Sequence, residues 1–292
     1  MKEPTVNVEF KNKQNPNAQF DLVKLESLLS RKGLNHSPLQ IHIAGFYILL
    51  FIEGGKGQHR VDFKDYSYSK GSIITIRKDQ LHQFYKSPTV KGLMLLFTND
   101  FLISYLENTE AKKAFQLFNE LLGDPKIQLT NKEYTEIQQL VQRINNEYFS
   151  INDSYSLGII RSELQILITK LYRIKSNRKQ IISNKKYLAE FITLQELVED
   201  KVTETIKVKD YADIMGKSTK TLNNITQSIV NKNAKDFINE ICIKQIKRLL
   251  LNTSHSIKEI SYLSGFEETT NFYKYFKHHI QTTPEKFRQE NS

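Results

Sequence analysis

Residues 256–288 read SIKEISYLSGFEETTNFYKYFKHHIQTTPEKFR, and this stretch decides the fold of the C-terminal part of the chain. Ser256 and the glutamate three residues later form a capping box, which predicts the start of a short helix. Gly265 ends that helix, and Phe272 and Phe276 then lie four residues apart on the inner face of a second helix. The stretch therefore predicts a short helix, a tight glycine turn and a second helix, which is a helix–turn–helix.

Polar and cationic side chains gather on the outer face of the second helix, which is predicted over residues 269–279. They are Thr270, Asn271, Lys274 and Lys277. An asparagine amide can bond the edge of adenine at two points, and a lysine can bond guanine. This face favours a contact with DNA, and the alternative is an ordinary solvated helix face.

Residues 208–252 repeat the same plan. Gly216 ends a short apolar helix, Ser218 caps the next helix, and three apolar side chains of that helix, Leu222, Ile225 and Ile229, are predicted to point inward. The side chains left for solvent or DNA are Lys220, Asn223, Asn224 and Gln227. A long helix from about residue 234 to residue 252 is predicted to join the two halves.

The spacing of several short motifs carries a resemblance to a known family. The motifs are Ile257-Lys258-Glu259-Ile260, Gly265-Phe266, Phe272, Phe276-Lys277, Thr283-Pro284 and Phe287-Arg288. Together they resemble the C-terminal signature of the AraC/XylS family of bacterial transcription regulators, and the resemblance covers roughly residues 187–290. It implies two recognition helices that enter successive major grooves on one face of DNA.

The resemblance also implies roles for nine side chains by their positions in the motif. Base contacts are expected for Lys220, Asn223, Asn224, Thr270, Asn271 and Lys274. Phosphate contacts are expected for Thr219, Tyr273 and Lys277, together with backbone amides at helix N-termini. For each residue the alternative is an ordinary solvated polar side chain.

The basic charge of the chain is concentrated in one segment. The formal net charge is +10, from 42 basic and 32 acidic residues. Residues 170–186 hold seven basic residues and no acidic one, namely Lys170, Arg173, Lys175, Arg178, Lys179, Lys185 and Lys186. Such a segment suits a nearby polyanion or a solvated linker. We predict a sensor domain over residues 1–175, a basic linker over 176–186 and a DNA-binding domain over 187–292.

The sequence pattern of the N-terminal part predicts a β domain followed by helices. Short apolar runs introduced by glycines between residues 39 and 98 predict a small barrel or sandwich. Residues 54–57 read as a hairpin turn, and the polar residues 1–19 read as a loose arm. Two apolar stripes, over 134–144 and 160–171, predict helices in the region 101–175. These helices could pack on the barrel or pair with a second copy, and the resemblance favours a dimer.

The strands also resemble the cupin-type sensor domain that often precedes this DNA-binding region. The frame of the second cupin motif is present at Gly71, Arg77, Asp79, His82 and Lys86, without its usual metal-ligand character. Lys64 stands where a carboxylate ligand is expected, and a lysine would repel a cation. We therefore expect no metal site and no cofactor. The candidate effector contacts are Tyr47, His59 and His82, and a structural histidine is the alternative for His82.

Two further observations narrow the class of protein. Cys242 is the only cysteine, which excludes a disulfide framework, and it reads as a small core residue. The start of the chain shows no signal peptide, so a cytoplasmic protein with no membrane contact is expected.

The sequence thus predicts a cupin-like β-barrel with packed helices, followed by an all-α domain with two helix–turn–helix motifs. The predicted function is sequence-specific DNA binding in transcription regulation, with activation favoured over repression. The expected partners are promoter DNA, RNA polymerase, a second copy of the chain and a small-molecule effector. No catalytic residues are predicted, and the alternative is a cupin-fold enzyme whose helical tail is an interaction module.

Overall fold

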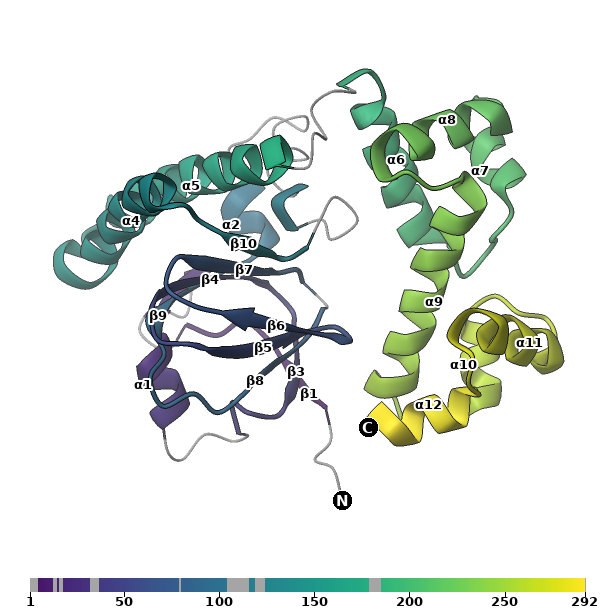
Figure 1. The fold of residues 1–292 in the computed structure, drawn as a ribbon, viewed down its shortest axis with the longest axis horizontal. Coiled ribbons are helices and arrows are strands. Elements are labelled where there is room, and N and C mark those ends of the chain that lie inside the picture. The colour runs from purple at the N-terminus through teal and green to yellow at the C-terminus, as the bar shows by residue number, and fades with distance from the viewer. Residues whose placement is uncertain are drawn as a thin grey trace. The chain divides into compact units, whose positions relative to one another are not determined.

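The structure is a computed structural model, and it describes residues 5–12, 15, 18–31, 37–78, 80–103, 116–118, 124–178 and 185–291. The chain divides into two compact units, one spanning Pro4–Gln180 and the other spanning Ile181–Ser292. The first unit is built mainly from strands and the second from helices (Figure 1). The predicted α+β class with an all-α C-terminal domain is confirmed. No helix in the described ranges is long and apolar enough to cross a membrane.

Two five-stranded sheets form the core of the first unit. The first sheet has the order β1 (Val6–Val8), β3 (Ile41–Ala44), β8 (Leu81–Phe84), β5 (Gly57–Val61) and β6 (Lys64–Tyr68). The second has the order β10 (Lys126–Gln128), β7 (Ser72–Ile76), β4 (Tyr47–Gly54), β9 (Lys91–Phe97) and β2 (Phe20–Lys24). All neighbouring pairs are antiparallel except β1 and β3, which are parallel. Two separate sheets replace the closed barrel of the prediction.

Strand β4 is buried on both of its faces, which explains its unbroken apolar sequence. Ile48, Leu50 and Ile52 belong to the apolar cluster that includes residues of both sheets. Tyr47 and its alternate neighbours on β4 face helices α4 (Asn131–Asn146) and α5 (Ser156–Arg178). The unit therefore has three layers, and the two predicted helices form the third layer (Figure 1).

Three local predictions for this unit are wrong. The arm over residues 1–19 contains strand β1, and buried Asn12 donates hydrogen bonds to the Phe20 carbonyl (2.9 Å) and the Tyr148 hydroxyl (3.1 Å). The turn over residues 54–57 joins β4 to β5, which lie in different sheets, so it closes no hairpin. The region from residue 101 is not all helical, because it includes β10. The other helical elements in the described part of the unit are α1 (Leu25–Ser30), α2 (Asn99–Ile103), η1 (Gln116–Phe118) and the π-helical turn η3 (Glu147–Ile151).

The second unit contains the helices that the sequence predicts. They are α6 (Lys185–Lys201), α7 (Val208–Ile214), α8 (Thr219–Val230), α9 (Ala234–Asn252), α10 (Ile257–Leu263), α11 (Thr269–Ile280) and α12 (Pro284–Asn291). The Ser256 capping box is present, and the Ser218 hydroxyl accepts a hydrogen bond from the backbone of α8. Cys242 is buried in α9, as predicted.

Described helices overlap both ends of the predicted linker, and part of the basic charge of residues 170–186 is used within the first unit. Helix α5 continues to Arg178 and α6 begins at Lys185, while residues 179–184 lie outside the described ranges. Lys175 is buried and donates to the Leu117 carbonyl (3.0 Å). Lys170 pairs with Glu136, and Arg178 pairs with Glu133. Three of the seven basic residues are therefore engaged in the sheet unit and do not form a free basic segment.

Three histidines interrupt the apolar layer between the sheets. His42 on β3 lies opposite His82 on β8, with ring centroids 5.6 Å apart, and the His59 ring on β5 lies 5.4 Å from that of His82. Both ring nitrogens of His59 and the Nδ1 of His82 have no hydrogen-bond partner among the described residues. Burial, with a smaller effect of His42, lowers the pKa of His59 to about 3. Burial and the neighbouring imidazoles also lower the pKa of His82 well below its usual value.

The neutral histidines predict a loss of stability in acid. The pKa of His59 is lower in the folded protein than in the unfolded chain, so the unfolded chain takes up a proton first as the pH falls below about 6.5. The stability is present above that pH and declines as the pH approaches the folded value of about 3. Between pH 7 and pH 5 the loss from His59 alone is about 2 kcal/mol.

Urea titrations at pH 7 and pH 5, read by hydrogen exchange of peptides from β4 and β9, measure this free energy of unfolding. His59→Leu is expected to remove about 2 kcal/mol of the pH dependence. The matched control is His255→Gln, at an exposed histidine of the second unit, whose unfolding the β4 and β9 peptides do not report. An unaltered pH dependence in His59→Leu would contradict the prediction.

Candidate nucleic-acid interface

The second unit presents two helix–turn–helix motifs with the same construction. Helices α7 and α8 form the first, and α10 and α11 form the second. Each turn contains a glycine with a positive φ, +61° at Gly216 and +80° at Gly265, a backbone conformation that side chains with a Cβ disfavour. The two motifs pack against α9, with α8 near one end and α10 to α12 toward the other end (Figure 1). Helix α9 has 19 residues and is about 28 Å long.

The outward face of α8 carries Thr219, Lys220 and Asn224. Their side chains are exposed and make no hydrogen bond or ion pair with any other residue that the structure describes. The apolar side chains Leu222 and Ile225 are buried on the opposite face, as predicted. The three outward side chains are therefore available to a ligand in solution.

Asn223 has a different position from its neighbours. Its side-chain carbonyl accepts a hydrogen bond from the Ala234 amide (2.8 Å), and its amide group donates to the Thr219 carbonyl (3.1 Å). The Ala234 amide is one of the first-turn donors of α9, which have no acceptor within their own helix. Asn223 thus ties α8 to the start of α9 through its side-chain oxygen, while its NH2 group bonds a carbonyl of α8 itself. The Gln227 amide is also engaged, since it donates to the Asn231 side chain (2.5 Å).

The outward face of α11 carries Thr270, Asn271, Lys274 and Lys277. All four side chains are exposed, and among the described residues none has a partner for its polar atoms. Within the described ranges no side chain caps the first turn of α11, so its first backbone N–H groups have no side-chain acceptor at the cap position. Lys277 lies in the last turn with two histidines, where positive charge is favourable to the helix dipole.

Tyr273, by contrast, has a hydrogen-bond partner within the unit. Its hydroxyl donates a hydrogen bond to the Glu285 carboxylate on α12, and this bond raises the pKa of Tyr273 to about 12. The hydroxyl therefore stays protonated at neutral pH and is directed at a carboxylate within the same unit. Seven of the nine predicted DNA contacts are thus exposed and unengaged, whereas Asn223 and Tyr273 have structural partners.

The candidate effector contacts of the first unit do not come together as one set. His59 and His82 lie in the layer between the sheets, and His59 makes an edge contact with Phe84, 4.5 Å between centroids. Tyr47 points to the other side of β4, where its ring lies against Phe97 and Phe118. In its place the structure brings His42 beside the two histidines.

Sequence reasoning missed His42, and the available signal was weak. It stands in a short run, Ile41-His42-Ile43-Ala44, that shows no clear period of two. Only the cross-strand pairing with His82 reveals its position. The described residues contain no group of three or more histidine, cysteine, aspartate or glutamate side chains arranged to hold a metal ion.

Comparison with known families assigns each unit separately. The AraC-like ligand binding domain matches residues 29–157, within the sheet unit. A helix-turn-helix domain matches residues 211–290, which include both motifs described above.

Several characterised relatives are similar over most of the chain. The Msm operon regulatory protein of Streptococcus mutans is 24% identical over 245 residues, which cover 84% of each chain. The HTH-type transcriptional activator RhaS of Enterobacter sp. is 20% identical over 272 residues, which cover 87% of this chain and 93% of RhaS. The xylose operon regulatory protein of Haemophilus influenzae is 31% identical over 97 residues, 33% of this chain and 25% of that protein.

Among solved structures, ToxT of Vibrio cholerae is 14% identical with a TM-score of 0.41, covering 92% of this chain and 97% of ToxT. The C-terminal domain of the response regulator yesN of Fusobacterium nucleatum is 24% identical with a TM-score of 0.31, covering 33% of this chain and 94% of that domain. With a ligand-binding match on the sheet unit, a helix-turn-helix match on the helical unit and full-length relatives that are transcription regulators, the chain belongs to the AraC/XylS family of DNA-binding transcription regulators.

Proposed function

We propose that the chain binds promoter DNA through α8 and α11, placed in successive major grooves, and activates transcription. The observation that carries this proposal is the set of exposed, unengaged polar side chains on the two helices that α9 holds. Successive major grooves on one face of DNA are about 34 Å apart. The length of α9, about 28 Å, is compatible with that spacing once the helices projecting from its two ends are included.

The side chains divide by chemistry into base and phosphate contacts. Lys220, Asn224, Asn271 and Lys274 supply the donors and acceptors that read base edges, with Thr270 beside them. Thr219, Lys277 and the open first turn of α11 suit phosphate oxygens, because charge and backbone N–H groups grip the backbone without reading sequence. Asn223 and Tyr273 lose their predicted DNA contacts in this proposal, since their polar atoms already hold α8 and α11 in place.

The layer between the sheets is the proposed effector site. His59 and His82 are neutral, so each imidazole offers one hydrogen-bond donor and one acceptor in an otherwise apolar setting. A small polar molecule that satisfies these nitrogens would gain hydrogen bonds that the described residues do not provide. We propose that such a molecule controls transcription, and that the chain acts in the cytoplasm without catalysing a reaction.

A second copy of the chain is the proposed partner of α5. The exposed positions of α5 between residues 157 and 172 carry no charge, and they are Gly158, Ile159, Ser162, Ile166 and Thr169. Ile159 and Ile166 are 45% and 44% exposed. In a two-fold antiparallel pairing centred near Ser162, each Ile159 meets the Ile166 of the other copy, so one face complements itself. The other residues of this face, Gly158, Ser162 and Thr169, are small and allow close approach of the helices.

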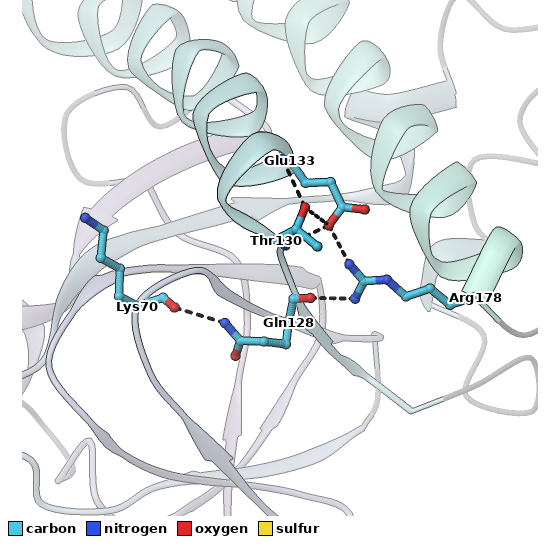
Figure 2. Close-up of polar contacts among 5 residues, drawn as sticks. All are labelled: Lys70, Gln128, Thr130, Glu133 and Arg178. Atoms are coloured by element: carbon cyan, nitrogen blue, oxygen red, sulfur yellow. Dashed lines mark hydrogen bonds and ion pairs between the residues drawn. The ribbon is translucent and has the colours of Figure 1, made fainter.

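The end of α5 offers a way to couple the two units. Figure 2 shows Arg178 donating to the Gln128 carbonyl of β10 and to the Glu133 carboxylate of α4. The Gln128 side chain in turn donates to the Lys70 carbonyl (3.0 Å) and accepts from the Ser72 hydroxyl of β7 (2.6 Å). We name this set the Arg178 clamp. A shift of β7 would be transmitted through the Arg178 clamp to the end of α5, where the connection to the DNA-binding unit begins. In this proposal the chain contacts RNA polymerase once it is bound to DNA.

DNA binding is tested first with a duplex selected from a randomised library by the purified protein. Asn271→Ala and Lys274→Ala are each expected to lower the specific affinity by about 1–3 kcal/mol, because each removes a base contact. Lys277→Ala is expected to weaken specific and non-specific binding alike and to reduce the salt dependence by about one phosphate contact. Fluorescence anisotropy at two salt concentrations measures both quantities.

The matched control for these variants is Lys258→Ala, at an exposed lysine of α10 to which the proposal assigns no DNA contact. Unchanged specific binding in both Asn271→Ala and Lys274→Ala would contradict the assigned base contacts. Absence of any selected sequence, together with turnover of a small molecule, would favour the alternative of a cupin-fold enzyme.

The proposed dimer is tested by placing charge on the uncharged face of α5. The double variant Ile159→Glu, Ile166→Glu is expected to raise the dimer dissociation constant about tenfold or more, because it buries like charges across the two-fold axis. Sedimentation velocity over a range of concentrations measures the constant. Ile214→Glu, at an exposed isoleucine of α7, is the control and leaves the constant unchanged. A double variant that dimerises like the wild type would rule out this face.

The clamp is tested by Arg178→Ala. We expect hydrogen exchange in the last turn of α5 to become about three- to tenfold faster, because two hydrogen bonds to other elements are lost at a partly exposed site. Output from a promoter reporter is expected to change while the affinity for one DNA site does not. Arg173→Ala, at an exposed arginine on the same helix, is the control. Equal exchange in both variants would contradict a role for the clamp.

A further inference from the structure

The two turn glycines of the DNA-binding unit differ in their surroundings. A Cβ added to Gly216 would have no atom within 4 Å. A Cβ added to Gly265 would lie 2.2 Å from the carbonyl oxygen of Thr203 and 2.8 Å from its carbonyl carbon. The positive φ values explain why both turns favour glycine. Only at Gly265 does the missing side chain also permit a close approach between two backbone segments.

Thr203 belongs to the first half of the unit, in the connection between α6 and α7. This connection is held at several points along its length. The amides of Glu204 and Thr205 bond the Lys201 carbonyl (2.8 and 3.0 Å), and the Tyr211 hydroxyl bonds the Thr205 carbonyl (2.6 Å). From α9, the Gln245 side chain bonds the Glu199 carbonyl near the end of α6 (2.9 Å). The carbonyl of Thr203 is therefore part of a fixed segment.

Gly265 belongs to the second half, in the turn that leads into α11. Its amide bonds the Tyr262 carbonyl (3.0 Å), and the Phe266 amide bonds the Ser261 carbonyl (3.1 Å). The Phe266 ring packs on Phe272 and Tyr275 of α11, at centroid distances of 5.4 and 5.2 Å. A displacement of this turn would therefore move α11.

We propose that Gly265 is a positioning residue for DNA recognition: its contact with Thr203 is a second link, beside α9, that fixes the recognition helix of the second half relative to the first. The inference rests on the proposed reading of DNA by both helices. One long helix joins two bodies but permits bending and rotation about its axis. A second contact away from the axis removes that freedom and sets the spacing of the two DNA half-sites.

The size of the contact indicates what a single methyl group would do. Real Cβ atoms are essentially never found within 3.0 Å of a neighbouring atom, so an alanine at 265 separates the two backbones by about 0.8 Å or more. Functional groups that read a ligand must be held within about 0.5 Å of the productive geometry. The displacement exceeds that tolerance at α11, while the helices themselves can remain folded.

The test compares Gly265→Ala with Gly216→Ala, which shares the cost of a positive φ without the contact. The probe is the duplex selected from a randomised library, made also with one base pair added or removed between its half-sites. We expect the wild type and Gly216→Ala to prefer the selected spacing by about tenfold or more. Gly265→Ala is expected to lose about tenfold in affinity at that spacing and to show a flattened or shifted spacing preference.

A structural role alone would lower the affinity equally at all three spacings and would overturn the inference, as would an unchanged spacing preference in Gly265→Ala. Circular dichroism confirms that each variant is folded at the assay temperature. If Gly265→Ala does not fold, the test uses Tyr211→Phe, which removes the hydrogen bond to the Thr205 carbonyl and keeps the buried ring. The inference then requires that Tyr211→Phe flattens the spacing preference. A wild type that selects a single half-site would overturn the two-groove reading and this inference with it, whereas the outcomes above leave that reading intact.

Discussion

The DNA-binding unit depends on the packing of two short helix pairs against one long helix. Helices α7 and α10 have seven residues each, and helices of that length are not stable alone in water. Their buried residues, Tyr211 and Ile260 among them, require an apolar partner surface, and α9 contributes Phe237, Ile241 and Ile246 to the core of the unit. Arg288 donates to the carbonyl of Leu250 (2.7 Å), which satisfies one of the last carbonyls of α9, and to the carbonyl of His255 (2.8 Å) in the connection to α10.

The helical unit could be predicted from the sequence because its signals are local. The Ser256 capping box, the Ser218 cap and the turn glycines each act within four residues of their own position. The sheet unit was predicted only in outline, because strand pairing joins distant segments. The pairing of β1 with β3 and of β10 with β7, and the meeting of His42 with His82, have no local signature in the sequence.

The candidate interface shows the same division between local and distant information. The period of α8 and α11 correctly separates buried from exposed positions, so Lys220, Asn271 and Lys274 are exposed as the pattern requires. The pattern cannot show that Asn223 reaches the first turn of α9 or that Tyr273 reaches Glu285. Both partners lie on the following helix, and only the packing of helices brings them together. Exposure is thus predictable from periodicity, whereas the engagement of polar atoms is not.

Polar groups are buried in the interior of the first unit and exposed on the recognition helices of the second. This difference affects how a signal would pass between the two units. In the sensor interior, neutral imidazoles lie in an apolar layer, where a new hydrogen bond or proton has a large effect on stability. At the DNA interface, single exposed contacts have modest effects, and the relative position of two helices matters more. The proposed effector would therefore act most strongly by changing the relative positions of structural elements. The Arg178 clamp lies at the end of α5, the last described element of the sensor unit. A rigid link at Gly265 fits this proposal. A displacement of the DNA-binding unit changes the positions of both recognition helices together only if the unit moves as one body.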